Sequence, residues 1–206
     1  MSSIAIVVGR ASGVWEELAA ARALAPNHVL FAVGRVGVDL DCPIAHWASW
    51  HPDLLRSWAG QRVSAGLPLA EHHWTGVSLA GSMMRRGWSR KNYHPELGHY
   101  ICRWNPTYRR RDTLPQIDFN LLDCPGGSSG LLATLAARLK GYKVILAGVP
   151  MDRHRGHYDQ AGEWSDAEAL RKVWKKEAPK WAGSVRSLSG WTAELLGEPS
   201  AAWVNE

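Results

Sequence analysis

The hydrophobic positions of the chain alternate between short continuous runs and runs with helical spacing. Ile4–Val8, His28–Val33, Ala45–Trp50 and Tyr142–Ala147 are continuous apolar runs, typical of parallel strands that are covered on both faces. Residues 14–24 instead place apolar side chains on one face of a helix. This alternation predicts an α/β, Rossmann-like fold, with a mainly parallel sheet sandwiched by helices.

Local signals place the ends of the helices. Ser12 is the predicted N-cap of the first helix, and Ser165 that of a helix over residues 166–181. We predict a short helix that follows His51-Pro52-Asp53 and ends at about Trp58, further helices over 131–139 and 191–196, and a short strand over 184–188. The tail from Pro199 is expected to be loosely packed.

The regular pattern breaks between about residues 62 and 120. This segment carries many Gly, His, Arg and Trp residues without a sustained period, so we interpret it as an irregular basic insertion with one short strand over 99–103. Within Arg85–Arg111, eight Lys or Arg residues stand against one acid and are interleaved with aromatic residues. Such a stretch either binds single-stranded nucleic acid or stacks on a sugar, or it is a solvated basic insertion. The whole chain, 1–206, is predicted to form one domain.

The charge and cysteine content indicate which ligands and which cellular compartment to expect. The formal net charge of +5 favours phosphorylated or polyanionic partners. No apolar run approaches the roughly 18 residues of a membrane span, and the start lacks the features of a signal peptide. Three widely spaced cysteines argue against a disulfide framework, so we expect a reducing, cytoplasmic setting. The oligomeric state stays open.

Two glycine-containing loops precede predicted helices and are candidate phosphate sites. The first, Gly9-Arg10-Ala11-Ser12-Gly13, follows the first strand, where backbone N–H groups and a helix dipole attract anions. The second, Gly126-Gly127-Ser128-Ser129-Gly130, adds hydroxyl groups that suit a ribose or phosphate. Each loop also has a purely structural interpretation, as a tight turn or a helix cap.

A third candidate site is the loop after the buried strand 142–147. Its titratable residues suit proton transfer and stabilisation of a departing phosphate. They are Asp152, Arg153, His154, Arg155, His157 and Tyr158. An exposed polar loop without a ligand is the alternative.

The sequence signals neither a resident metal nor a cofactor. His46, His51, His72 and His73 do not have the spacing of a zinc motif. The glycine loops match neither the dinucleotide fingerprint nor the P-loop, so NAD binding and ATP hydrolysis are not indicated.

Three stretches resemble a small Rossmann-like family of bacterial sialyltransferases that use a CMP-sugar, together with bacterial and phage proteins of related fold. "IAIVVGRASGVWEEL" is similar to the family's first strand, phosphate loop and helix. "VLFAVGR" is similar to its second strand, and "SSGLLATLAARLKGYKVILAGVPMD" to its Ser-Gly helix and the strand that follows. The resemblance covers about half of the chain and leaves 60–120 unmatched.

The resemblance implies nucleotide-contacting residues and a catalytic lid. By position, the implied nucleotide contacts are Gly9, Ser12, Gly13, Arg35, Ser128, Ser129 and Gly130. His157 would be the base, with His154 as the other candidate, and Tyr158 would contact the phosphate.

We therefore expect an enzyme: a metal-independent glycosyltransferase-like protein that uses a nucleotide-activated sugar. Arg153 and Arg155 would stabilise charge on the leaving phosphate. Two other functions remain open on the same scaffold. One is a non-catalytic protein, for example a viral one, that binds a nucleotide or nucleic acid through Arg85–Arg111. The other is a nucleotide hydrolase or phosphotransferase.

Overall fold

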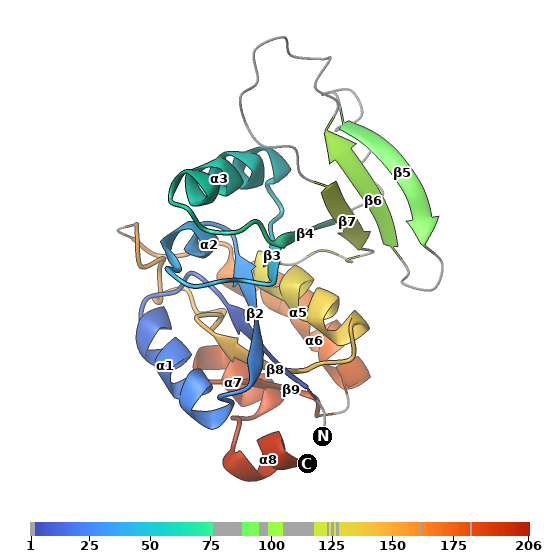
Figure 1. Cartoon of the computed structure of the whole chain (residues 1–206). Helices are drawn as coiled ribbons and strands as arrows, with labels where there is room; N and C mark the ends of the chain where they lie inside the picture. The colour runs from blue at the N-terminus through green and yellow to red at the C-terminus, as the bar shows by residue number, and fades with distance from the viewer. Residues whose placement is uncertain are drawn as a thin grey trace.

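The computed structural model of the chain describes residues 3–75, 88–94, 99–104, 118–122, 128–160, 162–181 and 183–206, together with Cys124 and Gly126. The described strands form one nine-stranded sheet in the order β5-β6-β7-β4-β3-β2-β1-β8-β9 (Figure 1). The strands are β1 Ile4–Val8, β2 His28–Val33, β3 His46–Ala48, β4 Glu71–Thr75, β5 Trp88–His94, β6 His99–Trp104, β7 Asp118–Leu122, β8 Lys143–Ala147 and β9 Val185–Ser187.

Helices connect most of these strands. They are α1 Val14–Leu24, α2 Val36–Asp39, α3 Pro52–Ser64, α5 Ser129–Leu139, α6 Ala167–Glu177, α7 Gly190–Leu196 and α8 Ala201–Asn205, with a 3₁₀ turn over Ala178–Trp181. In the part of the chain that the structure describes, no helix is both long and apolar enough to cross a membrane.

The parallel part of the sheet has a Rossmann-like topology, as the sequence predicted. The strands from β7 through β4, β3, β2, β1 and β8 to β9 all run parallel. From β1 the chain moves outward through β2, β3 and β4, and it later returns to β8 and β9 on the other side of β1. The strand order therefore reverses between β1 and β8. In open α/β sheets ligands bind beyond the carboxyl ends of the strands at such a point.

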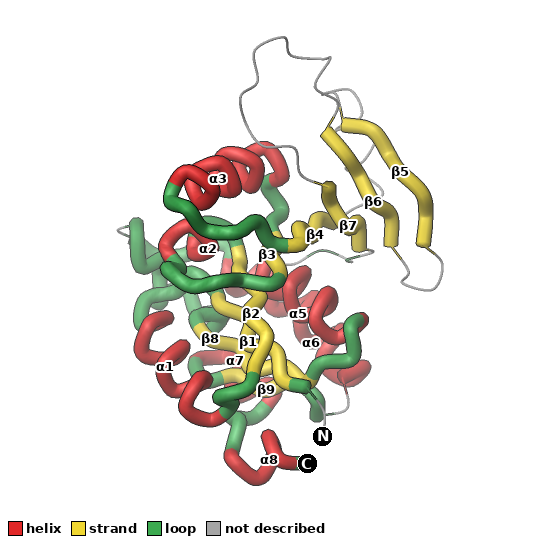
Figure 2. The backbone as a smooth tube through the Cα atoms, viewed as in Figure 1, coloured by secondary structure: helices red, strands yellow, loops and turns green. Residues whose placement is uncertain are grey.

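Helices cover both faces of the sheet, which gives two hydrophobic cores (Figure 2). Alternate residues of β1 divide between them: Ile4, Ile6 and Val8 pack with α1, α2 and α3, whereas Ala5 and Val7 pack with α5, α6 and α7. All five are buried. This two-sided burial explains why β1 reads as an unbroken apolar run.

The C-terminal segment is folded onto the domain, so the prediction of a loose tail is wrong. Trp203 of α8 is buried in the first core, and its indole Nε1 donates to the carbonyl of Gly183 at 2.8 Å. Lys143 Nζ donates to the carbonyl of Trp203 at 2.9 Å. Burial of one large aromatic side chain, Trp203, thus holds the C-terminal segment against the domain.

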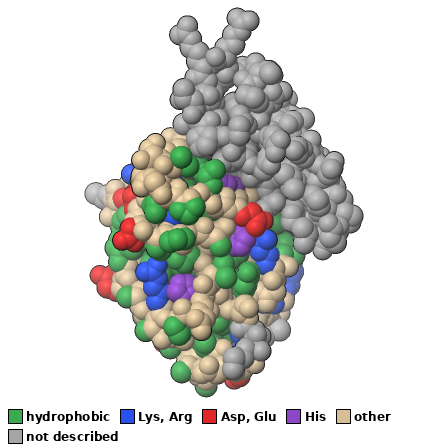
Figure 3. Space-filling view, in the orientation of Figure 1, with side chains coloured by type: hydrophobic (Ala, Val, Ile, Leu, Met, Phe, Trp, Pro, Cys, Tyr) green, Lys and Arg blue, Asp and Glu red, His purple; other side chains and the backbone are tan. Residues whose placement is uncertain are grey.

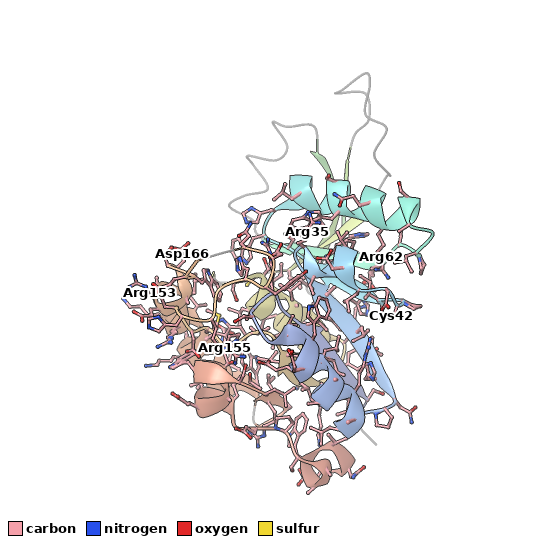
Figure 4. The ribbon with its side chains drawn as sticks, turned by 90° about the vertical axis from the view of Figure 1, so that its left-hand side faces the viewer. Arg35, Cys42, Arg62, Arg153, Arg155 and Asp166 are labelled. Carbon is pink, nitrogen blue, oxygen red and sulfur yellow. The ribbon has the colours of Figure 1, made fainter. Side chains whose placement is uncertain are left out.

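Several predicted helix boundaries move. α1 is capped by Gly13 with φ 83°, not by Ser12, and α6 is capped by Asp166 rather than Ser165. α3 continues to Ser64, six residues past the predicted end. Its extension is held by the buried Arg62, whose guanidinium donates to four backbone carbonyls. They belong to Gly37, Leu40, Cys42 and Pro68 (Figure 4).

The segment predicted as an irregular insertion contains sheet. β4 and β7 extend the parallel sheet, and β6 and β5 continue it through antiparallel pairing. The one short strand predicted there corresponds to β6, which covers His99–Trp104. β4 (EHHWT) and β5 (WSRKNYH) were missed because their sequences lack alternating hydrophobicity, whereas β7 (DFNLL) alternates over its first four residues and was missed although this short signal was present. The remainder of the basic stretch Arg85–Arg111 lies outside the described residues.

Candidate functional site

A pocket lies at the carboxyl ends of the central strands, at the point where the strand order reverses. Its lining comes from five segments of the chain that are distant in sequence. They supply Gly9, Arg10 and Ala11; Val33 and Gly34; Ser49, His51 and Trp58; Ser128, Ser129 and Gly130; and Gly148, Val149, His157 and Trp164. The fold therefore brings all three sequence-predicted site regions to one place.

The loop after β1 is joined closely to the end of β8. The N–H of Gly9 donates to the carbonyl of Ala147 at 2.6 Å, and that of Ala11 to the carbonyl of Gly148 at 3.1 Å. A Cβ on Gly9 would lie only 2.0 Å from the Gly148 oxygen. Glycine is thus required here by backbone–backbone contact, and these N–H groups are already paired within the protein.

The N-terminus of α1 is covered by the loop that follows β8. The N–H of Ser12 donates to the carbonyl of Gly156 at 2.8 Å. Arg155 Nη2 donates to the carbonyl of Ser12 at 3.1 Å and forms an ion pair with Glu17, also at 3.1 Å. Ser12, Gly13 and Arg155 are therefore brought together, but in a contact between loops rather than in the lining of the pocket.

The N-terminus of α5 is capped by a serine hydroxyl. Ser128 Oγ accepts from the N–H of Leu131 at 3.2 Å and from the indole of Trp174 at 3.4 Å. Ser128 is buried, with 9% of the residue exposed, and its hydroxyl serves mainly to cap the helix. The helix is eleven residues long, enough to carry a full dipole to its first turn.

The first turn of α5 opens into the pocket. Among the described residues, no acceptor is found for the backbone N–H groups of Ser129 and Gly130. Ser129 Oγ accepts from the N–H of Trp50 at 3.0 Å, which leaves its hydroxyl proton for a ligand. A Cβ on Gly130 would lie 2.8 Å from Val149, so glycine keeps this surface close to the backbone. Unpaired N–H groups at a helix N-terminus have the chemistry that attracts anions.

An ionic network borders the pocket. Arg10 binds both carboxylate oxygens of Asp159, with Nε–Oδ1 at 2.7 Å, and Arg35 lies 3.9 Å from the same carboxylate and 3.7 Å from Asp39. Tyr158 donates its hydroxyl to Asp39, outside the pocket lining. Burial and the Asp39 carboxylate raise the pKa of Tyr158 well above its usual value, so Tyr158 stays protonated. Arg35 belongs to this network and not to the lining.

His157 is the imidazole of the post-β8 loop that lines the pocket. Its Nδ1 lies 3.3 Å from Gln160 Oε1, and its ring lies 5.9 Å from that of Trp164. An amide oxygen accepts a hydrogen bond, which favours the tautomer with the proton on Nδ1. Nε2 then carries the lone pair that a general base requires.

Two other predicted residues of this loop point away from the pocket. The His154 side chain is 84% exposed, and its Nδ1 lies 2.9 Å from Glu163. Arg153 donates to the same carboxylate at 2.7 Å (Figure 4, where Arg153 is at the outer edge). Neither lines the pocket, and both pair with Glu163 on the outer side of the loop.

Asp152 is also placed outside the pocket. Its carboxylate accepts from Arg171 Nη2 at 2.8 Å and from the N–H of Trp191 at 3.2 Å. These contacts tie α6 and the N-terminus of α7 to the loop after β8. Asp152 is thus a connecting residue in this structure.

Sequence reasoning missed several lining residues that follow β3. Ser49 is buried, and its hydroxyl accepts from the N–H of His51 at 2.9 Å. Trp58 of α3 and Trp164 contribute aromatic walls. The sequence did offer a signal for these residues. Ligands bind beyond the carboxyl ends of parallel strands, and Ser49 and His51 come just after β3.

Comparison of the chain with protein-family models, with curated proteins and with solved structures gives no match. The likeness to CMP-sugar-dependent sialyltransferases therefore stays a prediction. A shared fold would not establish an activity in any case, so the function has to be argued from the pocket.

Proposed function

We propose that this protein transfers a glycosyl group from a nucleotide-activated sugar to an acceptor hydroxyl. The observation that carries the proposal is the convergence of α5, Arg10, His157 and two tryptophans on one pocket at the reversal of strand order. Open α/β sheets bind nucleotides at this position. The resemblance suggested by the sequence places the nucleotide on the same segments.

The phosphate is proposed to bind at the first turn of α5. The N–H groups of Ser129 and Gly130 and the hydroxyl of Ser129 supply hydrogen-bond donors there. Arg10 also lines the pocket, with its guanidinium charge paired to Asp159. The loop after β1, by contrast, forms part of the pocket wall but offers few hydrogen-bond donors, because the N–H groups of Gly9 and Ala11 are already paired.

The aromatic residues are proposed to hold the flat parts of the donor. Trp58 lies beside Gly34, with ring atoms about 3.9 Å from the position of a Cβ on that glycine. Trp164 lies on the His157 side of the pocket. Indole rings stack on the flat faces of bases and on sugars, and this contact does not depend on a particular hydrogen-bonding pattern. It therefore suits a nucleotide-sugar donor.

His157 is proposed as the general base. The acceptor oxygen attacks the anomeric carbon, its proton passes to His157 Nε2, and the bond from that carbon to the phosphate oxygen breaks with both electrons going to the phosphate. The α5 dipole and Arg10 stabilise the charge that develops on that oxygen. The chain thereby supplies its own hydrogen-bond donors and helix dipole for the leaving group.

A thermal-shift panel of nucleotides and nucleotide-sugars tests binding directly. A ligand at 100 times its dissociation constant stabilises the folded state by about 2.7 kcal/mol, or about 5–10 °C in Tm for a chain of this size. We expect such a shift with one nucleotide class, unchanged in size by EDTA. The nucleoside without phosphate should give a much smaller shift.

Matched tryptophan variants locate the binding. Trp58→Ala should abolish the shift, whereas Trp15→Ala, which removes an exposed tryptophan outside the pocket, should retain it. Absence of a shift with every phosphorylated ligand would refute the proposal. Release of free phosphate or sugar without an acceptor would indicate a hydrolase instead.

Binding of nucleic acid is the outcome to distinguish. On the face shown in Figure 3, charged side chains of both signs and histidines are scattered among hydrophobic ones over the described part of the molecule. No single basic patch dominates this view of the described residues. Salt-sensitive binding of oligonucleotides without a nucleotide shift would point to the stretch Arg85–Arg111.

A further inference from the structure

Three potential metal ligands converge on β3 and β4, on the face of the sheet that α5 covers. His46 Nδ1 lies 3.1 Å from His73 Nε2 and 3.2 Å from Glu71 Oε2. One ligand atom from each residue lies within 4.8 Å of the other two. Both histidines are buried, whereas the Glu71 side chain is 40% exposed and gives the cluster an opening to solvent.

The two distances from His46 Nδ1, 3.1 Å and 3.2 Å, match those between ligands that share one ion. Two atoms bound about 2.0–2.1 Å from a tetrahedral Zn²⁺ lie about 3.3 Å from each other. Hydrogen bonding alone accounts for the cluster less well. His46 Nδ1 carries at most one proton, and that proton cannot serve both Glu71 and His73 with good geometry. A cation accepts lone pairs from all three groups at once.

We propose that His46, Glu71 and His73 bind a divalent cation, with Zn²⁺ best suited to two imidazoles and one carboxylate. The site has three protein ligands among the described residues and a position left for water. Its inner wall is apolar: Phe31 stacks on His46 with ring centres 4.2 Å apart.

Lys140 gives the proposal a diagnostic feature. Its ammonium lies 3.1 Å from Glu71 Oε1, the oxygen that faces away from His46. It competes with a cation for the Glu71 charge, and it repels a divalent ion nearby. Removing the ammonium should therefore strengthen metal binding while weakening a purely hydrogen-bonded cluster.

The site would join two strands that share a short ladder. β3 and β4 pair through three residues, His46–Glu71, Trp47–His72 and Ala48–His73. His46 and Glu71 begin their strands, whereas the pocket lies beyond the strand ends. Chelation should therefore lower thermal stability without lowering the affinity of the pocket for a nucleotide.

The test uses the full chain, stripped with EDTA and dialysed, and then titrated with Zn²⁺ by calorimetry and with Co²⁺ by visible absorption. We expect one ion per chain and a Tm that rises with free metal. Glu71→Gln and His46→Gln should each weaken binding by about 100-fold or more. Lys140→Gln should tighten it by roughly tenfold.

Control variants and readouts keep the result decisive. His154→Gln removes a remote, exposed histidine and should bind metal as the wild type does. If His46→Gln fails to fold, Glu71→Gln and Lys140→Gln still decide, because their expected effects have opposite signs. Absence of stoichiometric binding, or equal binding by the wild type and Glu71→Gln, would overturn the proposal.

Discussion

Gly9 and Gly148 show at the residue scale how glycine is used in this pocket. A Cβ on Gly9 would collide with the Gly148 carbonyl, and one on Gly148 would collide with the Val14 side chain, so each glycine permits a different close contact. We predict that Gly9→Ala lowers the free energy of unfolding by about 3 kcal/mol or more. Urea denaturation measures the change.

Gly66→Ala provides a reference for the cost of backbone strain alone. Gly66 has φ +77° but open space around its Cβ position, so alanine meets strain without a collision, whereas Gly9 has no positive φ. Gly66→Ala should cost about 1 kcal/mol. A loss in Gly9→Ala no larger than that in Gly66→Ala would contradict the predicted collision with Gly148.

His157 carries the mechanistic prediction at this scale. His157→Ala should lower kcat about 10²–10⁴-fold, the usual contribution of a general base, while the nucleotide-induced Tm shift persists. His154→Ala should leave kcat unchanged, since His154 points to solvent. Gln160→Ala should lower kcat less than His157→Ala, because Gln160 only orients the ring. An unchanged kcat in His157→Ala would remove it from the mechanism.

Residue identity alone did not separate lining residues from supporting ones. Gly9, Arg10, Ser128, Ser129, Gly130 and His157 were predicted from the sequence and line the pocket. Ser12, Arg153, His154 and Tyr158 have equally suitable chemistry but pair elsewhere. Which way a loop side chain points depends on contacts with residues more than a hundred positions away, as Arg10 and Asp159 illustrate.

At the scale of elements, the loop after β8 contacts α1 through Arg155 and contacts α6 and α7 through Asp152. Asp152 at its start accepts hydrogen bonds from Arg171 of α6 and from the first turn of α7. We predict that Asp152→Ala lowers the free energy of unfolding by about 2 kcal/mol, as expected for hydrogen bonds to a charged group, and leaves nucleotide affinity unchanged. Chemical denaturation and the thermal-shift panel measure the two effects. Lost turnover with normal stability would instead support a catalytic Asp152.

Two helices begin near the pocket, and only one faces it. The N-termini of α1 and α5 both follow glycine- and serine-containing loops, so the sequence favours both as anion sites. In the folded chain, Arg155 and the carbonyl of Gly156 cover the first, whereas the first turn of the second stays open. The difference lies in what the post-β8 loop packs against.

At the scale of the whole molecule, Arg10 and Asp159 join the loops that follow β1 and β8. Burial raises the pKa of Asp159, but the hydrogen bonds and charge of Arg10 outweigh it, so the net pKa is below its usual value. A carboxyl with a lowered folded-state pKa adds stability that is fully present above about pH 4 and is lost as the pH falls through the folded value.

Asp159→Asn tests this acid dependence. The variant should be less stable than the wild type at neutral pH, and the difference should shrink as the pH falls below about 4, because the wild-type carboxylate becomes neutral. Urea unfolding across this pH range measures it. A constant difference at every pH would mean that Asp159 contributes by packing rather than by charge.

The sequence by itself determined the central α/β framework. Buried parallel strands leave continuous apolar runs, amphipathic helices leave a 3.6-residue period, and both signals are local. They predicted β1, β2, β8, α1 and α5 closely, and with them the end of the sheet at which the pocket lies. They also found the three loops that meet there, since such loops follow strand ends.

Only the tertiary structure decided which groups meet. The order of strands placed β3 beside β4, and this brought together three metal-ligand candidates with no recognisable spacing. It buried Trp203 in a C-terminal segment that the sequence did not mark as packed, and it extended the sheet through β4, whose sequence lacks alternating hydrophobicity. Pairing across long sequence separations depends on the global packing of the chain. No local pattern of residues records it.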